Sequence, residues 1–539
     1  MLSSIFLIGL LIFIIAFFTY GSYITKQFKL NNKKETPGHT LYDGVDFVPA
    51  KTPVLFGHHF SSIAGAGPIV GPILAGLAFG WGPAILWILI GSIFLGGVHD
   101  MAALVMSIRN KGRSIAEIAR LYISKEAYLV FLIFIWLTLV YVLIVFLDLT
   151  ATTFAKNGTV ASASIFYILL ALLLGFLLYK SKLKLSWLTI VFVILIFFGI
   201  YLAHLLPLKL TNGLWGLTPK ETWSSILILY AFIASVTPVW ILLQPRDYLS
   251  SFLLYAAVLG GAIGIIFGGH ALKYPIFISF HSNSGALFPI LFVTIACGAI
   301  SGFHSLVASG TSSKQLDQES SAKTIGYGGM LTEGLVALIA LATIMIIAKG
   351  SPITKSGGLG VFAQGMGQFL TIFHLPIKFG ATFGFLVLST FLLTTLDTAT
   401  RLARYTLQEL FNWDIKKTRF VATLITLILP AIFAFITLKD PKTGTVLPVW
   451  KAIWPIFGAT NQLLAAVGLL VASVWLIKTK RKFLFAFIPM IFMFLVTLYA
   501  LFLLIIKYKL SPIGIIGIIL FILSLFLIIE SGRILKKKT

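Results

Sequence analysis

The stretch that decides the fold of this chain is residues 57–72, which read Gly57-His58-His59-Phe60-Ser61-Ser62-Ile63-Ala64-Gly65-Ala66-Gly67-Pro68-Ile69-Val70-Gly71-Pro72. It lies inside an apolar run that is long enough to cross a bilayer. Its prolines remove backbone amide donors, and the glycines beside them loosen the backbone. Inside hydrocarbon, freed backbone groups are tolerated only where they are buried in protein or line a cavity. The stretch therefore predicts a membrane helix that breaks in mid-span, as transporters use to bind a solute or ion.

The composition of the chain also indicates a membrane protein. Of its 539 residues, 58% are hydrophobic and only 11% are charged. Soluble domains carry about 25% charged residues. Repeated apolar runs of about 20 residues match the length of a membrane-spanning helix. We therefore predict an all-α polytopic membrane protein with about fifteen transmembrane helices.

The distribution of positive charge predicts the orientation of the chain. The net charge of +24 does not indicate nucleic-acid binding, because the basic residues lie mostly in short clusters between apolar runs. Cytoplasmic loops of membrane proteins carry such clusters. Placing the N-terminus outside and alternating the spans puts most clusters inside. We therefore expect an external N-terminus, a cytoplasmic C-terminus and a lipid bilayer as partner. The oligomeric state is left open.

Soluble-type catalysis has no support in the sequence. The single cysteine, Cys297, excludes an intramolecular disulfide and a multi-cysteine metal site. The chain has no His-Glu-x-x-His, no phosphate-binding loop with Gly-Lys-Ser/Thr, and no Gly-x-Ser-x-Gly. We expect neither an enzyme nor a bound cofactor or metal; the expected ion is a coupling Na⁺ or H⁺.

The broken span supplies the predicted substrate site. Near Ile69 to Gly71, the start of the second half-helix offers backbone N–H groups and a positive helix end to an anionic group. The alternative is a kinked helix that uses Gly67-x-x-x-Gly71 for close packing. With two positions from a second interrupted span described next, the predicted substrate-binding residues are Ser61, Ser62, Gly65, Ala66, Gly67, Ile69, Gly71, Thr237 and Trp240.

A second interrupted span is predicted at residues 222–244, where Pro238 removes a backbone donor. A lone proline kink is the alternative. The two interrupted spans begin two runs of five spans, 57–206 and 222–405, of opposite orientation. This arrangement is typical of an inverted-repeat transporter with discontinuous helices. The predicted segments are an N-terminal helix with a cytoplasmic loop (1–56), a 5+5 inverted-repeat core (57–410) and C-terminal accessory transmembrane helices (411–539).

Ionisable residues inside the predicted spans are candidates for ion or proton coupling, because a membrane makes them costly. Asp100 and Glu333 lack a basic residue one helical turn away, and a buried carboxylate can take up a proton near neutral pH. Asp397 lies four residues before Arg401, so a plain salt bridge is its alternative. The histidines in these spans titrate in the same range, although a lone histidine on an apolar face is more often structural; they are His58, His59, His99 and His304.

Hydroxyl side chains add a candidate ion site. Those at positions 301, 305, 309 and 312 recur on one helical face and could ligate a sodium ion or hydrogen-bond a substrate. The alternative is that they bond to carbonyls of their own helix. The predicted coupling residues are His58, His59, Asp100, Ser309, Thr311, Ser312, Glu333 and Asp397.

Five blocks of the sequence resemble the carbon starvation protein A family: residues 57–72, 238–249, 296–315, 396–401 and 454–464. The first block is long and specific, and the resemblance covers nearly the whole chain. It implies a bacterial or archaeal inner-membrane transporter, similar to the amino acid–polyamine–organocation superfamily with its leucine-transporter-like 5+5 core. The family is linked to uptake of peptides, and in some members pyruvate, when carbon is scarce. The resemblance also implies a shorter C-terminal region than the long members have.

We therefore predict a secondary active transporter that imports a small carboxylate-bearing nutrient, a peptide or pyruvate, across the cytoplasmic membrane. Both substrates present a carboxylate, so a broken-helix site does not separate them. The alternative from another class is an intramembrane enzyme or sensor that uses His58, His59 and Asp100 as a metal or acid/base cluster. A channel is the third option.

Overall fold

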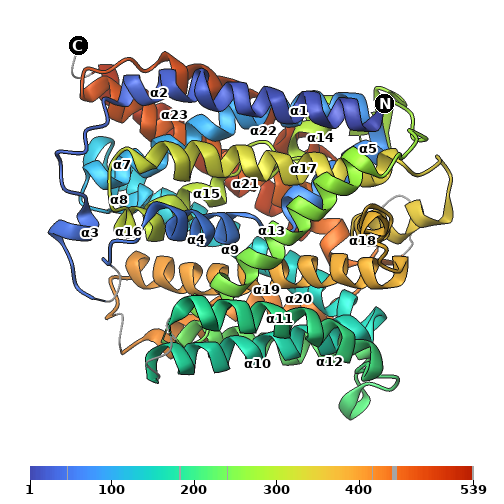
Figure 1. The fold of residues 1–539 in the computed structure, drawn as a ribbon. Coiled ribbons are helices and arrows are strands. Elements are labelled where there is room, and N and C mark those ends of the chain that lie inside the picture. The colour runs from blue at the N-terminus through green and yellow to red at the C-terminus, as the bar shows by residue number, and fades with distance from the viewer. Residues whose placement is uncertain are drawn as a thin grey trace. The chain divides into compact units, whose positions relative to one another are not determined.

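The computed structural model describes residues 1–44, 47–180, 184–238, 241–283, 285–414, 417–439 and 446–536. Helices make up most of these ranges, which confirms the predicted all-α class (Figure 1). The strands within them form two short antiparallel hairpins, β1 (His281–Ser282) with β2 (Gly285–Ala286) and β3 (Leu438–Lys439) with β4 (Val446–Leu447).

The described helices confirm a polytopic membrane protein. Eleven of them are long and apolar enough to cross a membrane, and a bent helix pair brings the number to twelve. Several expose large apolar side chains along their length, as the first helix does with Ile8, Leu11 and Ile15. Lipid, unlike water, is a favourable solvent for such a surface. The count of about fifteen spans stays a prediction.

The chain folds into two compact units, which we call unit 1 (residues 1–138, 270–354 and 455–539) and unit 2 (residues 139–269 and 355–454). The helices that lie in unit 1 are α1 (Leu2–Phe18), α2 (Tyr20–Phe28), α3 (Pro37–Thr40), α4 (Thr52–Ile63), α5 (Gly67–Phe79), α6 (Trp81–Ile90), η1 (Gly91–Gly96), α7 (Gly97–Arg109), α8 (Ile115–Tyr122), α14 (Leu287–Thr294), α15 (Gly302–Val307), η3 (Ala308–Ser312), α16 (Ser313–Gln315), η4 (Lys323–Gly328), α17 (Gly329–Met345), α22 (Leu484–Tyr508) and α23 (Pro512–Lys536).

Unit 2 holds a second set of long helices. Its helices are α10 (Gly158–Lys180), α11 (Leu185–Leu205), η2 (Leu214–Gly216), α12 (Pro219–Val236), α13 (Leu243–Phe267), α18 (Gly357–Phe369), η6 (Leu370–Phe373), α19 (Ile377–Leu410) and α20 (Arg419–Phe435). Three elements contribute residues to both units: α9 (Lys125–Lys156), η5 (Pro352–Ser356) and α21 (Val449–Lys478). The predicted division into residues 1–56, 57–410 and 411–539 is not tested by this grouping and stays a prediction.

The predicted break in the first span is present. Helices α4 and α5 meet at a bend of 48° across Ala64 to Ala66. Pro68 lies in the first turn of α5. Backbone N–H groups in the first turn have no partner within the helix, so the missing N–H of proline costs no hydrogen bond there. The break of this membrane helix at its glycine- and proline-rich stretch is therefore confirmed.

A second interrupted span lies in unit 1, at a place the sequence did not predict. Helix α14 ends at Thr294 and α15 begins at Gly302, with non-helical backbone between them. The helix predicted at residues 222–244 does stop before Pro238, because α12 ends at Val236 and α13 begins at Leu243. That residues 222–244 form one interrupted span stays a prediction. Thr237 is extended (φ −77°, ψ 146°), the conformation that a following proline favours.

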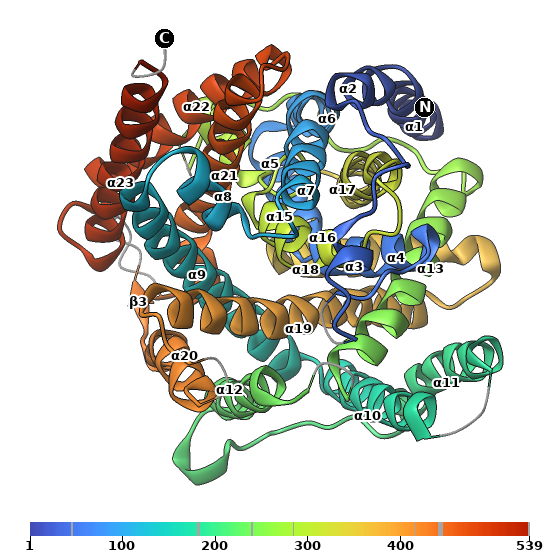
Figure 2. The same cartoon turned by 90° about the vertical axis from the view of Figure 1, so that its left-hand side faces the viewer.

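The two interrupted helices of unit 1 pack against each other in opposite directions. Helix α5 contacts α14, and α4 contacts α15, so the two breaks face one another. Helix α17 packs against α5, α6 and α7. Figure 2 shows α17 beside α6 and α7. The centre of unit 1 is therefore a bundle built around the two breaks.

Candidate functional site

A chain of buried acid and base side chains lies beside the two breaks. Asp100 on α7 receives hydrogen bonds from two histidines: its Oδ1 lies 2.7 Å from Nδ1 of His99, and its Oδ2 lies 2.7 Å from Nδ1 of His304 on α15. The other ring nitrogen of His304, Nε2, lies 2.9 Å from Oε2 of Glu333 on α17. This second contact is an ion pair by distance and not a well-directed hydrogen bond. We call Asp100, His304 and Glu333 the proton chain.

Segments of π-helix lie close in sequence to each member of the proton chain. The π segment η1 ends just before His99 and Asp100, η3 begins just after His304, and η4 ends shortly before Glu333. A π segment shifts the helical phase and is frequent at functional sites. Close backbone packing places η4 against α7, because a Cβ on Gly326 would lie 2.8 Å from the Cα of Met101.

The charges of the proton chain do not balance when every group is ionised. Asp100 and Glu333 carry two negative charges, and protonated His304 carries one positive charge. All three side chains are fully buried, and an uncompensated buried charge is costly. One further proton neutralises the chain. The geometry therefore suits a site that binds and releases a single proton.

His59, a predicted coupling residue on α4, lies next to this chain. Its Nδ1 is 2.8 Å from Oγ of Ser312 on η3, which links the first interrupted helix to the second. Its Nε2 is buried and has no hydrogen-bond partner among the described residues. A Cβ on Gly329, four residues before Glu333, would lie 3.5 Å from this nitrogen. His59 and Ser312 therefore border the proton chain.

The other predicted hydroxyls bond to backbone groups. Thr311 donates to the carbonyl of Val307 one turn earlier, 2.9 Å away. Ser309 donates to Ser305 O at 2.6 Å and accepts from Ile115 N at 3.1 Å. These contacts match the alternative in which hydroxyls satisfy their own helices. A sodium role for Ser309 and Thr311 stays a prediction.

The hydroxyls of the first break also bond within their helix. Ser61 and Ser62 both donate to the carbonyl of His58, at 3.1 and 2.8 Å. Gly65 and Ala66 form the break itself, and Ile69 is buried at the start of α5. The structure thus brings these predicted substrate residues to one place, and their role in binding stays a prediction.

The first break contacts the second break at two glycines, Gly67 and Gly71. A Cβ on Gly67 would lie 2.4 Å from Sγ and 2.6 Å from Cβ of Cys297, and a Cβ on Gly71 would lie 2.4 Å from Thr294 O. Contacts this short are not tolerated, so glycine allows the two backbones to approach. The packing alternative considered for Gly67 and Gly71 is therefore part of their role.

We expect Gly67→Ala to lower substrate uptake about tenfold, because the added methyl forces α5 away from Cys297. The double variant Gly67→Ala/Cys297→Gly removes the clashing atoms and should recover most of the uptake. Gly532→Ala is the matched control, since a Cβ there meets nothing within 4 Å. Initial uptake rates in vesicles, normalised to inserted protein, measure the effect. Wild-type uptake by Gly67→Ala would contradict a functional contact between the two breaks.

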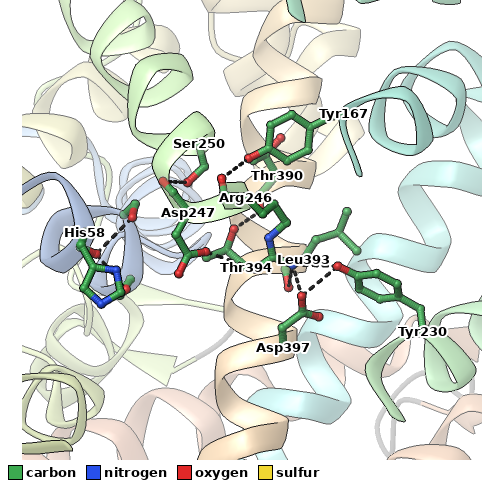
Figure 3. Close-up of polar contacts among 12 residues, drawn as sticks. His58, Tyr167, Tyr230, Arg246, Asp247, Ser250, Thr390, Leu393, Thr394 and Asp397 are labelled. Atoms are coloured by element: carbon green, nitrogen blue, oxygen red, sulfur yellow. Dashed lines mark hydrogen bonds and ion pairs between the residues drawn. The ribbon is translucent and has the colours of Figure 1, made fainter. Parts of the chain in front are cut away.

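Unit 2 contains a separate buried ion pair, drawn in Figure 3. Arg246 on α13 pairs with Asp397 on α19, and Tyr230 on α12 donates to the same carboxylate at 2.8 Å. Arg246 is completely buried, and Tyr167 on α10 donates to its carbonyl at 2.5 Å. One cluster therefore joins four helices of this unit.

This ion pair corrects one sequence interpretation. The sequence alternative paired Asp397 with Arg401, four residues later. In the structure, Arg401 donates to the carbonyls of Ala234 and Thr237, at 2.7 and 2.6 Å. Thr237, a predicted substrate residue, therefore lies at the end of α12 with its carbonyl bound by an arginine. Trp240, the other residue predicted there, lies outside the described residues.

Sequence reasoning did not assign the contacts of three side chains in these two buried clusters. His304 and His99 were noted only as histidines in apolar runs, and nothing local showed that both contact Asp100. Arg246 was not considered, although an arginine inside an apolar segment is itself a signal. Pairing each isolated basic residue with an isolated acidic one would have pointed to Asp397.

The chain is similar to several known proteins. The chain matches the family described as Carbon starvation protein CstA over residues 2–354 and 347–500. It is 32% identical to an Escherichia coli protein named peptide transporter CstA and 33% identical to one named pyruvate/proton symporter BtsT; each match covers 87% of this chain and 76% of the relative. A Bacillus subtilis peptide transporter CstA is 31% identical, over 98% of this chain and 96% of that relative.

Similarity to solved structures is weaker. The crystal structure of MhsT in complex with L-phenylalanine aligns with 90% of this chain and 99% of that chain, at a TM-score of 0.46 and 14% sequence identity. A similarity this low does not establish a shared fold.

Proposed function

Because the chain belongs to the carbon starvation protein CstA family, we propose that it imports a small carboxylate-bearing nutrient together with a proton. The chain is a secondary transporter of this family with a multi-pass membrane fold. Relatives named as peptide transporters and as a pyruvate/proton symporter support a peptide or pyruvate as the substrate. The transporter names also favour transport over the intramembrane enzyme or sensor.

The observation that carries the proposal is the proton chain. His304 joins two fully buried carboxylates, Asp100 and Glu333, and the three groups are neutral only after they bind one extra proton. Ser309 and Thr311 donate their hydroxyl hydrogens to carbonyls of their own helix. The support for H⁺ over Na⁺ as the coupling ion therefore comes from the proton chain.

The proton and the substrate site lie on connected helices. His304 belongs to the second interrupted helix, and Ser312 on the same segment bonds to His59 at the end of the first. The break after Ile63 is followed by the start of α5, which is buried. The N–H groups of Ile69 and Val70 bond to Ala66 O, so the positive end of α5, rather than free N–H groups at these two residues, would favour a carboxylate. Protonation of the chain and binding at the break therefore act on the same two helices. Alternating access then couples them.

The remaining proposals concern placement. We place the protein in the cytoplasmic membrane of a bacterium or archaeon, with its N-terminus outside and its C-terminus in the cytoplasm. Support for this orientation comes from the positively charged loops that fall on one side. We assign no bound cofactor or metal and no enzymatic activity.

Uptake into proteoliposomes tests the proposal. The purified protein should accumulate labelled pyruvate or a labelled dipeptide when the outside is acidic, and a protonophore should abolish the accumulation. An inward sodium gradient at equal pH on both sides should give none. Accumulation driven by sodium alone would contradict proton coupling. Failure of both substrates to move under either gradient would contradict the substrate class.

A further inference from the structure

From Pro455 onward, helix α21 belongs to unit 1 and lies beside the second break, although the sequence placed it among accessory helices. The most apolar 18-residue stretch of α21 is 94% buried inside the protein. Gly458, Asn461, Ala465 and Gly468 are spaced three or four residues apart and share one helical face. We call this the cradle face of α21.

The cradle face contacts the whole length of the second break by close backbone packing. A Cβ on Gly458 would lie 2.2 Å from the carbonyl oxygen of Val293, near the end of α14. At the start of α15, a Cβ on Gly302 would lie 2.5 Å from the amide nitrogen of Ala465. These distances leave no room for side chains between the two backbones. The two ends of the break therefore lie directly on α21.

Asn461 supplies the hydrogen bonds at the centre of this contact. Its Oδ1 accepts from the backbone N–H of Phe303 at 3.0 Å and from the hydroxyl of Ser301 at 3.2 Å. Its Nδ2 donates to Ser301 Oγ at 3.0 Å and to Cys297 Sγ at 3.3 Å. An oxygen that accepts from the first amides of a helix is an N-cap. Here the cap comes from another helix, more than 150 residues away in the sequence.

The capped end of α15 carries the central member of the proton chain. His304 follows Phe303 directly, so the bond from Phe303 N–H to Asn461 fixes the backbone next to the imidazole. The same face of α21 also contacts His99, because a Cβ on Gly468 would lie 2.8 Å from its Nε2. Both histidines that bind Asp100 are thus positioned against α21.

We propose that Asn461 is a positioning residue that holds His304 between Asp100 and Glu333, and that α21 is a working part of proton coupling. This inference rests on the proposed proton-coupled transport. Asn461 acts through the start of α15 and touches neither carboxylate. Its loss should let the imidazole move within its site, which loosens the link between proton and substrate while the substrate path stays intact.

Gln462 provides a matched control on the same helix. Its Nε2 donates to the carbonyl of Phe292 at 2.6 Å, at the α14 end of the break, away from His304. Gln462→Ala and Asn461→Ala each remove one buried amide from α21. Both should lower thermal stability, whereas only Asn461→Ala should affect coupling.

The experiment compares two transport modes of the purified protein in proteoliposomes. Counterflow exchange of labelled pyruvate needs no proton gradient, and accumulation under an inward proton gradient needs coupling. We expect Asn461→Ala to lower accumulation about tenfold and to keep exchange within about twofold of wild type. Gln462→Ala should lower neither selectively, and Asn461→Asp, which keeps the acceptor for Phe303, should recover most of the accumulation. If Asn461→Ala yields too little folded protein, Asn461→Thr takes its place.

A second measurement tests the accessibility of the second break and does not depend on transport. Cys297 is the only cysteine in the sequence, is half-buried, and accepts a hydrogen bond from Asn461. Its labelling by a membrane-permeant maleimide should be several-fold faster in Asn461→Ala than in wild type or Gln462→Ala.

The outcomes separate this inference from the function on which it rests. Equal effects of Asn461→Ala and Gln462→Ala on accumulation relative to exchange would overturn the positioning role, and so would unchanged accumulation in Asn461→Ala. A wild-type protein that shows no proton dependence would instead overturn the proposed coupling.

Discussion

His304→Gln is expected to lower proton-driven uptake about 100-fold or more. The imidazole contacts Asp100 through one nitrogen and Glu333 through the other. Glutamine fills a similar volume but cannot be protonated, so the two carboxylates lose the cation that they share. The chain then cannot pass a proton between α7 and α17. Initial rates of labelled pyruvate or dipeptide uptake under an acidic outside measure the loss.

The control for this variant is His281→Gln. His281 lies in the short strand β1, is exposed, and belongs to the same unit. Its uptake should equal that of wild type. A His304→Gln protein that is folded, inserted and transports at half the wild-type rate under the same gradient would rule out the imidazole as a coupling group.

Arg246→Ala is expected to destabilise the protein by about 3–5 kcal/mol, the usual effect of removing one partner from a buried ion pair. The variant leaves Asp397 buried without its guanidinium, in a cluster that joins α10, α12, α13 and α19. We expect a clear fall in the midpoint of thermal unfolding of the detergent-purified protein. The double variant Arg246→Gln/Asp397→Asn removes both charges of the Arg246–Asp397 pair and should recover part of the loss. The recovery is partial because Asp247, which also lies 3.3 Å from Arg246, keeps its charge.

The matched control replaces an arginine whose ion pair is exposed. Arg533 lies 3.9 Å from Glu530, and its side chain is 69% exposed. Exposed pairs contribute about 0–1 kcal/mol, so Arg533→Ala should leave the unfolding midpoint almost unchanged. Equal midpoints for Arg246→Ala and Arg533→Ala would show that the buried pair does not hold unit 2 together.

The first break could be predicted because its causes are local. Proline and glycine act on the backbone at their own positions. Pro68 and the glycines beside it therefore predict the bend without knowledge of how the rest of the chain packs. The end of α12 at Val236 has a local cause too. A proline disfavours helical backbone in the residue before it, and Thr237 is extended.

The second break could not be predicted in the same way. Residues 295–301 contain no proline, and small residues there also suit ordinary helix packing. Side chains from other helices hold this segment open: Ser92 donates to Gly298 O at 3.1 Å, and Asn461 caps the start of α15. Tertiary contacts of this kind have no signature in the local sequence.

The candidate site was recognised in pieces but not as an assembly. Asp100 and Glu333 attracted notice because a carboxylate in an apolar run is costly. Their common partner His304 is 204 residues from Asp100 in the sequence, and Arg246 is 151 residues from Asp397. Rules for residues one helical turn apart cannot reach such distances, which is why Arg401 was paired with Asp397.

Lumenal pH recorded in proteoliposomes tests the account most directly. A pH-sensitive dye inside the vesicles reports proton entry when pyruvate or a dipeptide is added outside. The account predicts that the substrate acidifies the lumen of wild-type vesicles and that His304→Gln vesicles show no substrate-dependent change. Substrate-dependent acidification of equal size in both would contradict the claim that the buried chain of Asp100, His304 and Glu333 carries the coupled proton.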